Sequence, residues 1–274
     1  MGNVLSAEMF KLRKEKVTLI IFLINLFLVS VFSLAIALIT RFVGEELAND
    51  PDMVAMGMDV MFSQYSTYAP AGAFSLMYQF IAIYAAVFAG FFVCSEFETG
   101  TIRNTLSVGK SRSGYYLSKV ITIFTASIIL AVIGTAIYVG IEMLFFDFTP
   151  GDGYVVNLLL LIGGKFLVYL TYVSLFTMLA FVLRGIAATL GIAVGFAFLI
   201  ELILHMILNA GFFEPVRFLQ NIFPYHHVLQ FNDVFLNGVS GNEITYLTSV
   251  AVCVVIIILT TVIGLFTFNK RDIK

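Results

Sequence analysis

The residues best suited to polar chemistry lie in two places along this apolar sequence. The first is the stretch Ser95–Lys119, which is polar and basic although long apolar runs precede and follow it. The second is a row of three polar residues inside an apolar run, Glu201, His205 and Asn209. Their i, i+4, i+8 spacing places the three side chains on one face of a helix.

The basic turn Gly109-Lys110-Ser111 has the residues that end a phosphate-binding loop. Such a loop also requires a glycine five positions before its second glycine, and Asn104 occupies that position. No buried strand leads into the segment, and the chain has no His-Glu-x-x-His pair of a metalloprotease. We therefore expect no cofactor or metal on this chain and no hydrolytic activity of its own.

Glu201 is the most unusual residue of the second place. An ionisable residue inside a membrane span costs about 2.5–3.5 kcal/mol, so it is expected to face protein or a cavity. The row Glu201, His205 and Asn209 then either lines a substrate path or subunit interface, or fixes helix packing through hydrogen bonds. Both interpretations stay open. A metal site would need a third ligand, and none is evident.

Lys165 and the pair His226-His227 complete the candidate polar residues. Lys165 precedes an apolar run, and we expect it to mark the outer end of a span and to extend toward the interface. A buried Lys165–Glu201 ion pair is the alternative. His226 and His227 follow Pro224-Tyr225 and are expected in an interfacial loop, with pH sensing as the alternative.

The composition requires that lipid surround most of the chain. Of 274 residues, 60% are hydrophobic and only 12% are charged, and the mean hydropathy is +1.01. A soluble domain could not hide this much apolar surface from water. No strongly basic domain exists, so a nucleic-acid partner is not expected. We predict a multi-pass protein of the cell membrane.

Six apolar runs are long enough to cross a hydrocarbon core of about 30 Å. They are continuous and do not alternate, which favours helices over a barrel. The predicted spans are 17–39, 74–94, 120–141, 166–183, 187–208 and 246–268, with an interfacial helix at 1–16, an inner loop at 95–119 and outer segments at 41–73 and 209–245. The predicted fold is thus a single all-α transmembrane domain.

The distribution of basic residues predicts the orientation. Twelve of the fifteen basic residues fall on one side if the N-terminus is placed in the cytoplasm, and only Arg41, Lys165 and Arg217 lie at or beyond the other. Because basic residues concentrate in cytoplasmic loops, both termini are predicted to be cytoplasmic.

The inner loop has an ordered pattern of charges. Acidic Glu96 and Glu98 come first, then Gly100-Thr101-Ile102-Arg103, and then the basic turn with Lys110, Ser111 and Arg112. Acids near a helix start and bases toward its end favour a short helix from Glu98 to about Leu106. Tyr115-Tyr116 then suit re-entry at the membrane interface.

With this loop, the chain resembles the permease subunits of ABC exporters of the type-two class, the drug, bacteriocin-immunity and polysaccharide exporters. The resemblance rests on Glu96-Phe97-Glu98-Thr99-Gly100-Thr101-Ile102-Arg103, on Lys110-Ser111-Arg112, on the layout of spans and on the basic tail 268–274.

The resemblance implies that the inner loop is a coupling helix that docks on a separate ATPase subunit. The residues implied to contact or orient that subunit are Glu96, Glu98, Gly100, Thr101, Arg103, Lys110, Ser111 and Arg112. It further implies a second permease subunit, identical or different, and ATP with Mg²⁺ on the partner ATPase. The many phenylalanines suggest an apolar or amphipathic substrate such as an antimicrobial peptide, a toxin or a drug, exported from a bacterial cell.

Two other functions remain open from the sequence. One is an ion-coupled secondary transporter or channel that uses Glu201 and His205, although the spans lack the Gly/Pro breaks of many such carriers. The other is a membrane partner of an ATPase that transports nothing.

Overall fold

The chain folds into helices and no strand throughout the part that the computed structural model describes, which is residues 2–48, 83–107, 111–145, 154–209, 211–237 and 242–271. This confirms the predicted all-helical class. The elements are α1 (Gly2–Lys14), α2 (Lys16–Ala48), the π-helical segment η1 (Gly90–Cys94), α5 (Ser95–Glu98), α6 (Thr101–Ser107), α7 (Arg112–Phe145), α8 (Tyr154–Leu183), α9 (Ile186–Gly195), the π-helical segment η2 (Phe196–Ile200), α10 (Glu201–Asn209), the 3₁₀ helix η3 (Gly211–Ile222), α11 (Pro224–Asn237) and α12 (Glu243–Lys270).

Four of the described helices are long and apolar enough to cross a membrane. They are Lys16–Ile39 within α2, Arg112–Phe145, Val155–Leu183 and Glu243–Lys270, and they contain the first, third, fourth and sixth predicted spans. Helices satisfy every backbone hydrogen bond internally, which is why long apolar runs adopt them in lipid.

The second and fifth predicted spans have a less regular form. The helix Ile83–Glu98 passes the same test together with α6, from which it is bent by 73°. The run 187–208 is helical in three consecutive pieces, α9, η2 and α10. Each piece by itself is too short to cross a membrane. The total of six spans therefore remains a prediction.

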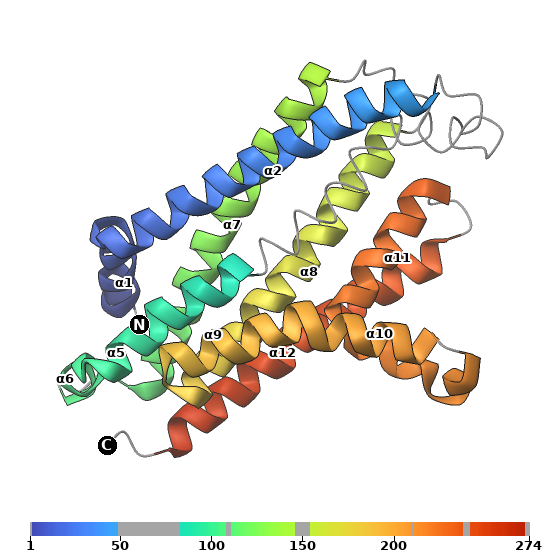
Figure 1. Ribbon diagram of the computed structural model, residues 1–274. Coiled ribbons are helices and arrows are strands. Elements are labelled where there is room, and N and C mark those ends of the chain that lie inside the picture. Colours follow the sequence, from blue (N-terminus) through green and yellow to red (C-terminus); the bar gives the residue numbers. More distant parts are fainter. Residues whose placement is uncertain are drawn as a thin grey trace.

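Helix α8 is the centre of the molecule, and it packs against α7, α9, α11 and α12 (Figure 1). In the most apolar 18-residue stretch of each helix, the buried share is 56% for α8, compared with 18% for α2 and 17% for α12. Since α2 and α12 leave most of their apolar surface uncovered, these two helices have the character of lipid-facing elements.

One end of the molecule gathers several elements that are distant in sequence. Helix α1 packs against α7, and in Figure 1 α1, α5, α6 and the C-terminal end of α12 lie together at this end. The 34 residues of α7 start at Arg112, so the last part of the predicted loop 95–119 is the first two turns of a long helix. We call this end of the molecule the α6 end.

Two predicted boundaries change in the structure. The short helix expected from Glu98 to about Leu106 is present as α6, but it begins at Thr101, because α5 ends at Glu98 and the bend at Gly100 follows. Helix α8 begins at Tyr154 instead of 166, so Lys165 lies three turns inside the helix and does not mark its end. Lys165 is also fully buried, which contradicts the expectation that it extends to the interface.

The packing of α8 against α11 requires a residue without a side chain at position 164. A Cβ atom added to Gly164 would lie 2.6 Å from Cδ1 of Phe231, whose ring is buried. A Cβ atom added to the neighbouring Gly163 would have no atom of another element within 4 Å among the described residues. The two adjacent glycines thus have opposite environments on one helix.

We expect Gly164→Ala to destabilise the protein by about 1–3 kcal/mol, because it overpacks the contact with Phe231. Gly163→Ala is the matched control and should be neutral or stabilising by up to about 1 kcal/mol, since alanine favours helix. Thermal unfolding in detergent measures both. Equal stability of the two variants would contradict the proposed contact.

Candidate functional site

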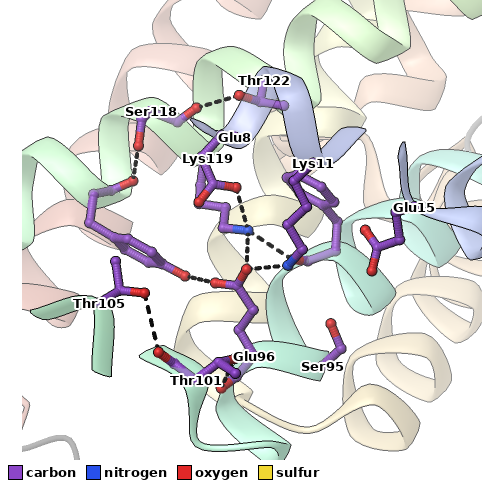
Figure 2. A network of polar contacts seen from close by, with 12 residues as sticks. Glu8, Lys11, Glu15, Ser95, Glu96, Thr101, Thr105, Ser118, Lys119 and Thr122 are labelled. Carbon is purple, nitrogen blue, oxygen red and sulfur yellow. Dashed lines mark hydrogen bonds and ion pairs between the residues drawn. The ribbon is translucent and has the colours of Figure 1, made fainter. Parts of the chain in front are cut away.

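A buried cluster of charges lies at the α6 end, between α1, α5 and α7 (Figure 2). At its centre is Lys119, whose side chain is fully buried. Its Nζ atom lies 2.9 Å from Oε1 of Glu96 and 2.7 Å from Oε2 of Glu8. Lys11 forms a further ion pair with Oε1 of Glu96. We call these four residues the ion cluster.

The ion cluster balances its own charge. Two carboxylates meet two ammonium groups, and the hydroxyl of Tyr115 donates a hydrogen bond to Oε2 of Glu96. Lys119 also donates to the carbonyl oxygen of Phe92 at 3.3 Å and lies 3.9 Å from the centroid of the Phe92 ring. Burying an ion costs several kcal/mol unless it is paired, and here each of the four ions faces at least one ion of opposite charge. Oε2 of Glu8 makes the ion pair with Lys119 but no hydrogen bond among the described residues.

Lys11 keeps its positive charge in this setting. Burial by itself lowers the pKa of Lys11, but the hydrogen bond and the charge of Glu96 outweigh burial and raise the pKa above its ordinary value. The ion pair between α1 and α5 therefore persists at physiological pH.

Helix α6 projects from this cluster through a sharp bend. Gly100 has a φ angle of 70°, a left-handed conformation that glycine adopts without strain. The hydroxyl of Thr101 donates to the carbonyl oxygen of Glu96 at 3.4 Å, which joins the two sides of the bend. Ile102 is buried, whereas Arg103 and Asn104 are exposed. Helix α6 is thus anchored on one side and presents polar residues on the other.

Behind α6, five aromatic rings join four helices. Phe97 of α5, Tyr115 and Tyr116 of α7, Phe181 of α8 and Phe268 of α12 stack or meet edge to face, and the centroids of Tyr116 and Phe181 are 4.6 Å apart. We call these rings the aromatic cluster. Aromatic pairs add about 0.5–1.5 kcal/mol each beyond burial, so the α6 end is firmly packed.

Glu98, Ser111 and Arg112, three of the residues implied to contact an ATPase, bond to helix ends of this same chain. Oε1 of Glu98 accepts a hydrogen bond from N of Ile186, the first residue of α9, at 2.9 Å. The hydroxyl oxygen of Ser111 accepts from N of Gly114 at 3.2 Å and so caps α7. Arg112 donates to two carbonyl oxygens at the end of α12. Lys110 lies outside the described residues.

The structure therefore separates the predicted coupling residues into two groups. Glu96, Glu98 and Arg112 bond to other helices of the chain and Ser111 caps α7, while Thr101 and Arg103 lie exposed on α6. Gly100 makes the bend between the two groups.

A second polar site surrounds Glu201, which is buried on α10. The hydroxyl of Tyr172 on α8 donates to Oε2 of Glu201, and Oε1 has no hydrogen-bond partner among the described residues. The ring of His205 lies 5.4 Å from that of Tyr225 and 6.0 Å from that of His226. The side chain of Asn209 lies outside the described residues.

The histidines next to this site are neutral at ordinary pH. Burial lowers the pKa of His226 to about 4, and the neighbouring His227 and His205 contribute. His227 is buried, and its Nε2 lies 2.9 Å from the carbonyl oxygen of Asn221. The pair expected in an interfacial loop belongs to helix α11 and packs against this site. These two histidines therefore add little positive charge to the second polar site.

Sequence analysis missed the partners of Glu96. The sequence indicates Lys119 as the end of the polar stretch 95–119, Glu8 as a member of the predicted interfacial helix, and both Lys119 and Lys11 as part of the cytoplasmic charge bias, but it does not indicate that they meet. A signal was present, since Glu8 and Lys11 are spaced i, i+3 and Lys119 directly precedes an apolar run. The pairing itself joins residues up to 111 positions apart (Glu8 to Lys119), and no local pattern encodes such a contact.

Comparison with known proteins places the chain in a family. Residues 53–274 match the family described as "Protein of unknown function (DUF2705)", and the chain belongs to this family. No curated protein matches the sequence. The family description assigns no activity, so the functional argument depends on the site itself.

We expect Lys119→Met to destabilise the protein by about 3–5 kcal/mol, because it leaves two carboxylates buried without their common cation. Thermal unfolding of the purified protein in detergent measures the loss, and adding Glu8→Gln should recover part of it. Lys14→Met, at an exposed position of α1, is the control and should stay within about 0.5 kcal/mol of the wild type. Equal losses in both variants would show that the ion cluster is not a stabilising unit.

Proposed function

We propose that this chain is the membrane permease subunit of an ATP-driven exporter and that α6 is the element through which a separate ATPase subunit acts on it. The observation that carries the proposal is the form of α6. It is a short helix bent by 73° from the helix before it, with Ile102 buried and Arg103 and Asn104 exposed. A partner can bind the exposed side, while the buried side transfers its motion.

The contacts behind α6 give such a motion a route into the spans. Glu96 connects the bend to α1 and α7 through the ion cluster. Phe97 connects it to α8 and α12 through the aromatic cluster. Alternating access requires two discrete packings of the spans, and a rigid connection from one surface helix to four others can bias that choice.

The remaining parts of the proposal follow the resemblance to type-two exporters. The transporter would contain two permease subunits, identical or different, and two ATPase subunits that bind ATP and Mg²⁺. The permease would lie in the plasma membrane with six spans and both termini in the cytoplasm. Its substrate would be apolar or amphipathic, such as an antimicrobial peptide, a toxin or a drug.

Glu201 supports a second candidate function, an ion-coupled transporter. A buried glutamate that receives a hydrogen bond from Tyr172, and whose other oxygen has no hydrogen-bond partner among the described residues, suits reversible binding of a proton. His205 lies on the same helix and packs toward the same site. This candidate requires transport in vesicles without ATP, driven by an ion gradient and lost in Glu201→Gln. ATP-dependent transport that survives both Glu201→Gln and collapse of the gradient would exclude it.

Arg103→Glu tests the leading proposal most directly, because Arg103 is exposed on α6 and reversing its charge changes the proposed docking face alone. We expect the variant to fold normally, to lose the copurifying ATPase by at least tenfold and to lose transport. A coupling energy of about 1.4 kcal/mol already corresponds to a tenfold change. Glu98 is a poorer choice, since its loss also uncaps α9.

The matched control for this experiment is Arg13→Glu, since Arg13 is another exposed arginine and belongs to α1, a helix of the α6 end. Copurification of an ATPase that contains its own phosphate-binding loop, retained in Arg13→Glu and lost in Arg103→Glu, is the supporting result. If Arg103→Glu keeps both the ATPase and transport, α6 is not the coupling element.

A further inference from the structure

Helix α1 turns its apolar positions toward the protein. Val4 is buried, Leu12 packs against the core, and Glu8 on the same side forms its ion pair with Lys119 of α7. In Figure 1, α1 turns away from the line of α2 and lies beside α7, which it contacts. An amphipathic helix that lies free on a membrane directs such apolar residues into lipid. Here the protein covers them, so any membrane contact of α1 must use its other face.

The other face of α1 carries exposed cations and one aromatic ring. Phe10, Arg13 and Lys14 are exposed, and their spacing of three and four residues places them on one side of the helix. The side chain of Phe10 is 63% exposed. Lys16, the first residue of α2, is exposed as well. We call these four residues the α1 outer face. Cations beside an aromatic ring suit contact with phospholipid headgroups.

The charges of the α1 outer face do not cancel. Residues 2–19 include two acids, and one of them, Glu8, belongs to the ion cluster, whose four charges balance one another. The other is the half-buried Glu15, whose Oε2 accepts a hydrogen bond from a hydroxyl of α2 at 3.3 Å. Against this one carboxylate stand Arg13, Lys14 and Lys16, none of which forms an ion pair in the described part of the chain. Two positive charges are left over.

The neighbouring helices bring no further acid to this face. After Lys16 the first acid of α2 is Glu45, and the first acid of α7 is Glu142, each far along its helix. On α5, Glu96 belongs to the ion cluster, and Glu98 accepts a hydrogen bond from the start of α9. The surplus of positive charge therefore remains once the acids of α1, α2, α5 and α7 have been counted.

The start of α2 indicates the depth of the α1 outer face in the membrane. Val17, Leu19 and Ile20 are exposed in the two turns that follow Lys16, within the apolar stretch Lys16–Ile39. Exposed apolar residues at the start of a span face acyl chains. The cations that directly precede them lie where acyl chains give way to water, and basic side chains extend to this level. Phospholipid phosphates occupy the same level.

We propose that the α1 outer face binds the headgroups of anionic phospholipids in the leaflet where α2 begins, and that charge supplies its selectivity. The three cations contact phosphates, and the Phe10 ring rests among the headgroups. The lipid-facing side of α2 continues directly into this face, which favours lipid over a protein as its partner. Because the inner face of the same helix supplies Glu8 to Lys119, bound lipid also holds the ion cluster in place. The proposal involves neither α6 nor an ATPase.

The test titrates the purified full-length chain in detergent with phosphatidylglycerol or with phosphatidylcholine of identical acyl chains, and native mass spectrometry counts the bound lipids. We expect a preference for phosphatidylglycerol of about tenfold or more, because each surplus cation near a membrane surface contributes roughly a fivefold gain for anionic lipid. Lys14→Gln with Lys16→Gln removes the surplus and should abolish the preference. Binding of phosphatidylcholine should not change, since that lipid has no net charge.

Two further variants separate charge from apolar contact and from position. Phe10→Ala should weaken the binding of both lipids to the same extent and keep the preference, because the ring is uncharged. Arg103→Gln removes an exposed cation of α6 and should also keep the preference. Lys14 and Lys16 are exposed, so the lysine variant should fold normally, which an unchanged melting temperature in detergent without lipid verifies.

Three results would overturn the proposal. One is equal binding of the two lipids by the wild type. Another is a preference that survives Lys14→Gln with Lys16→Gln, or that is lost equally in Arg103→Gln or Phe10→Ala. The third is the loss of a copurified protein in the lysine variant without any lipid preference in the wild type, which would assign the α1 outer face to a protein partner instead.

Discussion

The burial of one ammonium group, that of Lys119, is the constraint on which the α6 end depends. A fully buried cation is tolerated only where carboxylates and hydrogen-bond acceptors surround it, and here Glu8 and Glu96 supply the charge. Because Glu8 lies on α1 and Glu96 just before the bend at Gly100, neutralising Lys119 fixes the position of both elements against α7. The N-terminal helix is thereby part of the folded core at this end.

Several helix ends at the α6 end are capped by side chains of other helices. Glu98 bonds to the start of α9, Arg112 to the end of α12 and Arg271 to the end of α8. Unsatisfied backbone groups at helix termini are costly near lipid, so long-range capping stabilises this end. It also means that a force on the loop between α5 and α7 reaches several spans directly. This arrangement is the physical basis of the proposed coupling through α6.

The helices of the spans are joined by hydroxyl groups and by close packing at a glycine, whereas the ion cluster joins helices by ion pairs. Hydroxyl groups join α8 to α12, as where the hydroxyls of Ser174 and Thr260 lie 2.6 Å apart. Tyr172 satisfies one oxygen of Glu201, and Gly164 lets the ring of Phe231 approach the backbone of α8. Small and hydroxyl residues bring helices close in lipid, where apolar side chains alone give no preference for protein over solvent. The second polar site is therefore embedded in tight packing, in contrast to the exposed side of α6.

The sequence by itself determined the helical class, the membrane setting and the approximate position of most spans, because apolar runs of this length have few alternatives in lipid. It also located the loop that carries Glu96 and Gly100, because the charges of this loop interrupt the apolar runs. The glycine permits the left-handed conformation of the bend. Only the tertiary structure decided which of those charges are internal. Lys119 forms ion pairs with Glu8 and Glu96, which lie on other helices. Lys165 is buried, because α8 begins about three turns before the apolar run that predicted it. Ion pairs and burial depend on which helices meet, and that choice arises from the packing of the whole chain.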